Sequence, residues 1–132
     1  MTPRENITIN GTVSGGDKTT GSYWMEWKKA EVKANAIIVN CYFHADFNAG
    51  NGSSTITKVY NSPNDYGISI LGGTYSNVSL SIITANGSSS TGQRAEARLS
   101  FNVNGASNWG SSTAKLKLFV TGGGVATASL TN

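Results

Sequence analysis

The side chains able to do chemistry are few in this chain and lie far apart in the sequence. The one histidine is His44, and the aspartates, Asp17, Asp46 and Asp65, fall in separate segments. Metal binding and general acid–base catalysis need several such groups within coordination or hydrogen-bonding reach of one another. A lone histidine among scattered carboxylates is more typical of a hydrogen-bonded structural residue. The sequence therefore predicts no enzyme, no metal site and no cofactor.

The single cysteine, Cys41, rules out an internal disulfide. It stands in the stretch IIVNCYF, in phase with Ile37, Val39 and Phe43 for an extended chain. No histidine or asparagine arrangement supports a reactive thiolate at this position. We expect a buried and unreactive thiol.

Composition narrows the class of protein further. The net charge is +3, charged residues make up 13% of the 132 residues, and the ten lysines and arginines are scattered. Nucleic-acid binding draws its affinity from a dense basic surface, which this chain does not have. No apolar run reaches the length of a membrane span. Low charge with many Gly, Ser, Thr and Asn residues suits a β-protein that works outside the cell or in a virion.

The aromatic residues offer the main alternative to a purely structural role. Sugar sites often combine an exposed ring with neighbouring amides, and Trp24, Trp27 and the pair Asn108 and Trp109 are the candidate ligand-binding residues. Trp109 precedes a glycine in a turn-rich stretch, which favours its exposure. In small sandwiches, however, aromatics more often belong to the core.

The elements that must position these residues read as β-strands. Alternating apolar residues predict strands over 22–32, 36–47, 54–60, 66–71, around Val78 to Ile82, and over 93–103, 113–121 and 125–131. Turn-forming residues predict loops over 15–21, 48–54 and 86–92. Short strands punctuated by turns, without a helical period, predict an all-β, immunoglobulin-like antiparallel β-sandwich.

The stretch ENITINGTVS, residues 5–14, has the most distinctive pattern. Ile7, Ile9, Gly11 and Val13 recur at spacing two, so in an extended strand they share one face. A glycine on that face indicates either a bulge in an ordinary first strand or a position where another part of the structure approaches closely.

This stretch resembles the N-terminal extension of chaperone-usher pilins, in which an I-x-I-x-G-x-V pattern forms the donor strand. The segment Trp24 to Lys28, WMEWK, looks like the tryptophan- and lysine-containing stretch that follows the extension in the cysteine-poor branch of fimbrial subunits. The lack of a cysteine pair agrees with that branch. The C-terminus, SLTN, departs from the pilin pattern, which ends in a strand with a tyrosine near the carboxylate.

The resemblance implies residues 1–16 as an N-terminal extension and residues 17–132 as a single sandwich domain. In that family the extension completes the fold of the next subunit, so Ile7, Ile9, Gly11 and Val13 would be the inserted residues. The expected function is a structural subunit of an extracellular fimbria (pilus) that contributes to bacterial adhesion. Its partners would be identical or related subunits, a periplasmic chaperone, an outer-membrane usher and a host glycan or protein receptor.

Two alternatives remain open from the sequence. A phage virion protein, such as a decoration or tail component, suits the opening MTPREN, which has no apolar leader core, and the atypical C-terminus. The opening fits equally a chain whose leader was removed. A carbohydrate-binding adhesin domain suits the aromatic residues.

Overall fold

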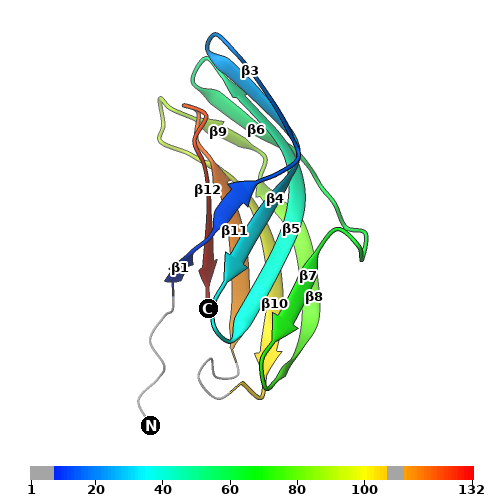
Figure 1. Cartoon of the computed structure of the whole chain (residues 1–132). Coiled ribbons are helices and arrows are strands. Elements are labelled where there is room, and N and C mark those ends of the chain that lie inside the picture. Colours follow the sequence, from blue (N-terminus) through cyan, green and yellow to red (C-terminus); the bar gives the residue numbers. More distant parts are fainter. Residues whose placement is uncertain (1–7, 107–111) are drawn as a thin grey trace.

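Alternating apolar and polar residues fold into two antiparallel β-sheets that face each other, as the computed structural model shows (Figure 1). The structure describes residues 8–106 and 112–132. One sheet has the order β1-β12-β11-β10-β8; the other has the order β2-β4-β5-β6-β9, with β3 paired to β4 and β7 paired to β5. The predicted all-β antiparallel sandwich is confirmed. The strands are β1 (Thr8–Asn10), β2 (Thr12–Ser14), β3 (Asp17–Gly21), β4 (Trp24–Asn35), β5 (Val39–Gly50), β6 (Ser53–Val59), β7 (Gly67–Ile70), β8 (Thr74–Thr84), β9 (Asn86–Ser88), β10 (Ala95–Asn104), β11 (Thr113–Val120) and β12 (Ala126–Thr131).

The core lies between the sheets and is built from alternate residues of the central strands. Strand β10 alternates strictly between buried and half-buried residues from Ala95 to Val103, and β11 does the same from Thr113 to Val120. Packing of this kind removes apolar area from water, worth roughly 25 cal/mol per Å². The inward phases expected for β5, β10 and β11 are confirmed. The largest fully buried side chains are Phe43, Phe47, Phe101, Ile56, Leu99, Leu116, Leu118, Leu130, Val32, Val39, Val103 and Val120.

The start of β5 differs from the sequence-based expectation. Ile37 shares the phase of the core residues but is 89% exposed, because β5 begins only at Val39. The backbone N–H of Ala36 donates to the carbonyl of Val39, so residues 36–39 form a turn. A turn breaks the two-residue period, and Ile37 leaves the inner face.

Two of the predicted loops contain strands. Residues 17–21 form β3, which pairs with the first half of β4, and residues 86–88 form β9, which pairs with β6. Aspartate and glycine, which have low strand propensity, begin and end β3, and asparagine and glycine make up most of β9. Pairing with a long neighbouring strand overrides that propensity.

The predicted loop 48–54 is a two-residue hairpin turn. Strand β5 continues to Gly50 and β6 starts at Ser53. Asn51 and Gly52 have φ values of 53° and 81°. Positive φ at both central residues is the geometry of the type I′ turn, for which Asn-Gly is the preferred sequence. The dipeptide was visible in the sequence and defines the ends of both strands.

Bulges bend the sheet where it leaves the sandwich body. The register of β4 on β5 shifts between Trp27 and Ala30, and Lys29 has a φ of 51°. The carboxylate of Asp46 anchors this bulge, since its Oδ1 accepts bonds from the Lys29 N–H and the Tyr60 hydroxyl, each 2.7 Å long. Beyond this level the hairpins β3–β4 and β5–β6 extend past the end of the other sheet (Figure 1). We call this part the hairpin end.

Candidate functional site

The segment Thr8–Ser14 joins the edges of the two sheets. Strand β1 pairs with the last strand, β12, in the register Thr8↔Thr131 to Asn10↔Ser129. Strand β2 pairs with β4 in the register Thr12↔Lys33 to Ser14↔Glu31. The segment therefore crosses from one sheet to the other along one side of the sandwich. We call Thr8–Ser14 the seam segment.

Gly11 lies at the point where the seam segment crosses between the sheets. Its N–H donates to the carbonyl of Ala128 over 2.9 Å. A Cβ built on Gly11 would collide with the carbonyl oxygen of Lys33 and would lie 3.1 Å from the Ala128 Cβ. Backbone from β4 and side-chain atoms from β12 thus leave no room for a larger residue, and the close approach is to the glycine's own domain.

The apolar side chains of the seam segment cover the edge of the core. Ile9 and Val13 are half-buried and pack against it, whereas Thr8, Asn10, Thr12 and Ser14 are exposed. Ile7, the first of the four predicted donor residues, lies outside the described residues. Donation of the segment to a neighbouring subunit stays a prediction.

Two glycines connect the seam segment to β3. Gly15 and Gly16 have φ values of 67° and 64°, which glycine adopts without steric cost. The carbonyl of Gly15 accepts a 2.7 Å bond from the indole N–H of Trp27. Trp27 is therefore a reporter of whether the seam segment is in place.

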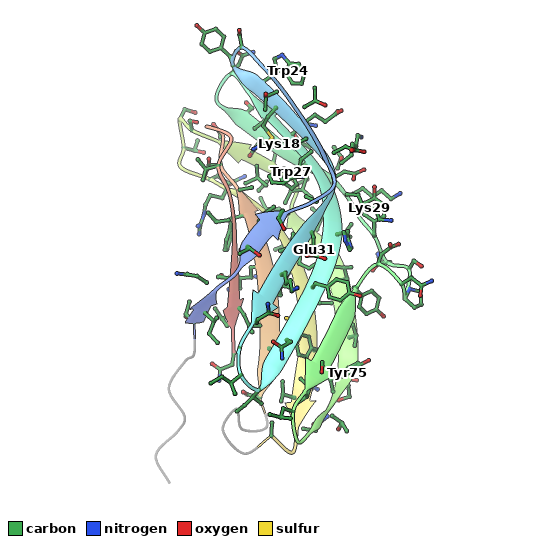
Figure 2. All side chains as sticks on the ribbon, in the orientation of Figure 1. Lys18, Trp24, Trp27, Lys29, Glu31 and Tyr75 are labelled. Atoms are coloured by element: carbon green, nitrogen blue, oxygen red, sulfur yellow. The ribbon has the colours of Figure 1, made fainter. Side chains whose placement is uncertain are left out.

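The candidate ligand-binding tryptophans lie on opposite faces of β4. Trp27 packs on Phe47 with a ring separation of 5.4 Å, and the Nζ of Lys18 lies 4.7 Å from the Trp27 ring centroid. Trp24 is 48% exposed at the hairpin end (Figure 2). The structure does not bring these two rings together. Asn108 and Trp109 lie outside the described residues.

Glycines on both neighbouring strands make room for Trp24. Gly21 on β3 and Gly50 on β5 are its register partners. A Cβ on Gly21 would collide with the Trp24 indole, and a Cβ on Gly50 would lie 3.0 Å from the Trp24 Cβ. The ring therefore lies across Gly21, which a side chain on β3 would prevent.

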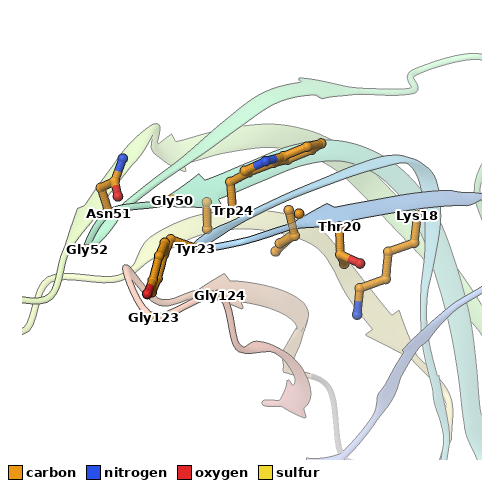
Figure 3. A pocket seen from close by; sticks show the side chains of 12 residues that line it. Lys18, Thr20, Tyr23, Trp24, Gly50, Asn51, Gly52, Gly123 and Gly124 are labelled. Carbon is orange, nitrogen blue, oxygen red and sulfur yellow. The ribbon is translucent and has the colours of Figure 1, made fainter.

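A second feature of the hairpin end is Tyr23, which the sequence analysis did not single out. Its φ is 70° and its side chain is 85% exposed. Positive φ is uncommon for a bulky residue, and such strain is often found at functional sites. Figure 3 shows Tyr23 pointing toward Gly123 and Gly124 and away from Trp24. The open cleft on this inner side has a volume of about 450 Å³, and its wall includes Lys18, Thr20 and Met25 together with part of Trp24.

His44, Cys41 and Tyr60 are titratable groups in structural positions. His44 Nδ1 lies 2.6 Å from the carbonyl oxygen of Asp65, as expected for a satisfied polar residue. Cys41 is buried, and burial raises the pKa of its thiol to about 12. The hydrogen bond to Asp46, followed by burial and the nearby charges of Asp46 and Asp65, raises the pKa of Tyr60 to about 12.

Within residues 8–106 and 112–132, no three metal-ligating side chains gather at one point. In the same part of the chain, no helix has the length and apolar character needed to cross a bilayer.

The comparisons with known proteins support the fold alone. No family model matches the chain, and no curated protein matches it. A crystal structure of the hypothetical protein lmo2686 from Listeria monocytogenes EGD-e is similar, with a TM-score of 0.57 and 18% sequence identity. The similarity covers 89% of this chain and 72% of the Listeria chain. At this identity the two proteins share an architecture, and the function must be argued from the chain's own residues.

Proposed function

We propose that this chain is a structural subunit of an extracellular fibre, of the chaperone-usher fimbrial kind, in which the seam segment of one copy completes the next copy. The observation that carries the proposal is that the seam segment is bound by the kind of contacts that a strand makes at the edge of a sheet. Its contacts are strand pairing to β12 and β4, with Ile9 and Val13 half-buried on the core edge. A neighbouring copy could supply the same contacts.

The physical basis is strand addition. Main-chain hydrogen bonds supply affinity, and alternate side chains that enter the core edge fix the register. Ile9 and Val13 supply the side chains. Lys33 and Ala128 approach so closely that only a glycine fits between them, so Gly11 also fixes the register. A slip of one residue would place the polar face on the core, so the pairing has a single favoured register.

The connection to β3 is suited to such an exchange. Gly15 and Gly16 can change backbone conformation at low steric cost, so the segment could leave its own domain without disturbing β3. Addition from one copy to the next is head-to-tail and heterologous, and it propagates as a fibre unless the ring closes. The partners would be identical or related subunits, with a chaperone and an usher during assembly.

The experiment traps the seam segment covalently wherever it pairs. Asn10 and Ser129 face each other in register, and the Cα atoms of such antiparallel pairs lie about 4.5–5.5 Å apart, within disulfide range. The variant N10C/S129C is refolded at high concentration, oxidised and run on a non-reducing gel. Strand exchange predicts a ladder of cross-linked multimers.

A matched control uses two strands that belong to one domain. Lys117 on β11 also faces Ser129 on β12, so the variant K117C/S129C should give cross-linked monomer alone. If N10C/S129C also gives only cross-linked monomer, the seam segment closes its own domain and the proposal is wrong. Light scattering on the full chain and on a version without residues 1–16 supplies the matching size measurement.

A further inference from the structure

The outer face of the hairpin end carries two rows of side chains set by strand register. Met25 is buried in the core, so its neighbours Trp24 and Glu26 project from the other face of β4. In the first row, Trp24 lies between Gly21 and Gly50. The second row runs across five strands and consists of Thr19, Glu26, Asn48, Thr55 and Asn86. We call Trp24 with this second row the outer platform.

The polar groups of the outer platform are available to a ligand. The side chains of Trp24, Glu26 and Asn48 make no hydrogen bond or ion pair with another described residue. Thr55 donates to the Asn86 Oδ1 over 3.0 Å, which orients the amide and leaves its N–H groups as donors. The row thus presents carboxylate, amide and hydroxyl groups of both donor and acceptor type.

The shape of the outer platform is a shallow groove on a sheet. A groove of about 490 Å³ is lined by residues that include Trp24, Glu26, Asn48 and Thr55. Neighbouring strands lie about 4.8 Å apart, so a row across five strands spans roughly 19 Å. An extended ligand could contact the whole row, whereas a small compact one could not.

We propose that the outer platform binds a neutral oligosaccharide or polysaccharide chain. Trp24 would stack on the apolar C–H face of one sugar ring, because its indole lies over Gly21 and is half exposed. Glu26, Asn48 and Asn86 would pair with sugar hydroxyls, which are both donors and acceptors and so match a mixed row. Aromatic stacking with a few placed polar groups is the usual composition of a specific site.

Charge favours a neutral ligand. The exposed carboxylate of Glu26 stands in the second row and repels a polyanion. Lys28, two residues further along β4, has its Nζ 3.9 Å from the Asp46 Oδ2. The Nζ of Lys58 lies 4.4 Å from the Tyr60 ring centroid, also beyond the second row. The outer platform itself contains one carboxylate and no lysine or arginine, so a nucleic acid or an acidic glycan would meet a negative charge there.

The first test is affinity electrophoresis of the full chain in gels that contain a β-glucan, a mannan or a xylan, together with pull-down on cellulose and chitin. We expect retardation or capture by at least one of these neutral polysaccharides. Absence of binding to all of them, or binding only to an acidic polysaccharide, overturns the proposal.

The variants locate the site. Trp24→Ala should weaken binding by about tenfold or more, which corresponds to roughly 1.4 kcal/mol, while Trp24→Phe should keep most of it because a ring remains. Tyr23→Asn is the matched control, since Tyr23 is the adjacent residue but points to the inner cleft (Figure 3). Circular dichroism and Tm confirm that each variant is folded. If Tyr23→Asn abolishes binding and Trp24→Ala does not, the outer platform is not the site.

Discussion

At the scale of single residues, Asp46 organises the place where the hairpins leave the sandwich body. It is 6% exposed, yet its Oδ1 accepts hydrogen bonds from the Lys29 N–H and the Tyr60 hydroxyl. A buried carboxylate is stable only when such donors satisfy it. The same hydrogen bond raises the pKa of Tyr60, so its contribution to stability depends on pH.

The Tyr60–Asp46 hydrogen bond should stabilise the fold only while Tyr60 is protonated. The pKa of Tyr60 is about 12 in the folded protein, against an ordinary value of 10.0. Its contribution is therefore complete below pH 10 and is lost as the pH rises through 12. The measurement compares the free energy of unfolding of the wild type and Tyr60→Phe across this range. The difference between them should shrink above pH 10, and a difference that stays constant would contradict the assigned pKa.

Tyr23 should be a residue at which substitution increases stability. Its φ of 70° costs an L-residue roughly 1–2 kcal/mol, and asparagine tolerates this region better. We expect Tyr23→Asn to raise the free energy of unfolding by about 1 kcal/mol, measured by urea denaturation. Ser22→Asn, at the adjacent turn position without positive φ, is the control and should have little effect. An unchanged or lower stability for Tyr23→Asn would show that its side-chain contacts outweigh the backbone strain.

At the scale of elements, the seam segment should detach when its crossing point is blocked. Valine at position 11 would collide with the Lys33 carbonyl, so Gly11→Val should release residues 8–14 at a cost of roughly 1–3 kcal/mol. Hydrogen exchange would show lost protection at position 11 and at Val13, with β10 and β11 still protected. Thr12→Val, at an exposed position of β2, should keep the segment in place. Retained protection in Gly11→Val would mean that the crossing can relax.

At the scale of the whole molecule, the two sheets should unfold as one unit because they share a single core. Leu99 on β10 is fully buried, and Leu99→Ala should cost about 3 kcal/mol, within the range for large-to-small core substitutions. The decrease in the free energy of unfolding should be the same whether unfolding is followed by circular dichroism or by tryptophan fluorescence. Circular dichroism reports both sheets, and Trp24 and Trp27, which lie in the other sheet, contribute to the fluorescence. Ser100→Ala, on the opposite face of β10, is the control. Separate transitions for the two probes would contradict a shared core.

The sequence by itself determined the parts of the fold that depend on local pattern. Strands β5, β10 and β11 alternate apolar and polar residues so regularly that only a two-sided sheet with one buried face accommodates them. The absence of a cysteine pair and the isolation of His44 likewise follow from composition. The type I′ turn at Asn51-Gly52 is also encoded locally, because this dipeptide predicts a two-residue hairpin turn in place of the loop expected over 48–54.

Tertiary structure alone decided the features that depend on a partner strand. Strand β3 exists because β4 is long enough to pair with it, although the aspartate and glycine at its two ends favour a turn. Trp24 and Trp27 lie on opposite faces of β4, because side chains alternate along a strand. Trp24 belongs to the outer platform because glycines on the neighbouring strands leave room for its ring, whereas Trp27 packs on Phe47. The outer platform likewise combines residues from five strands. Register between strands is a long-range property, and a single sequence does not specify which distant residues will stand side by side.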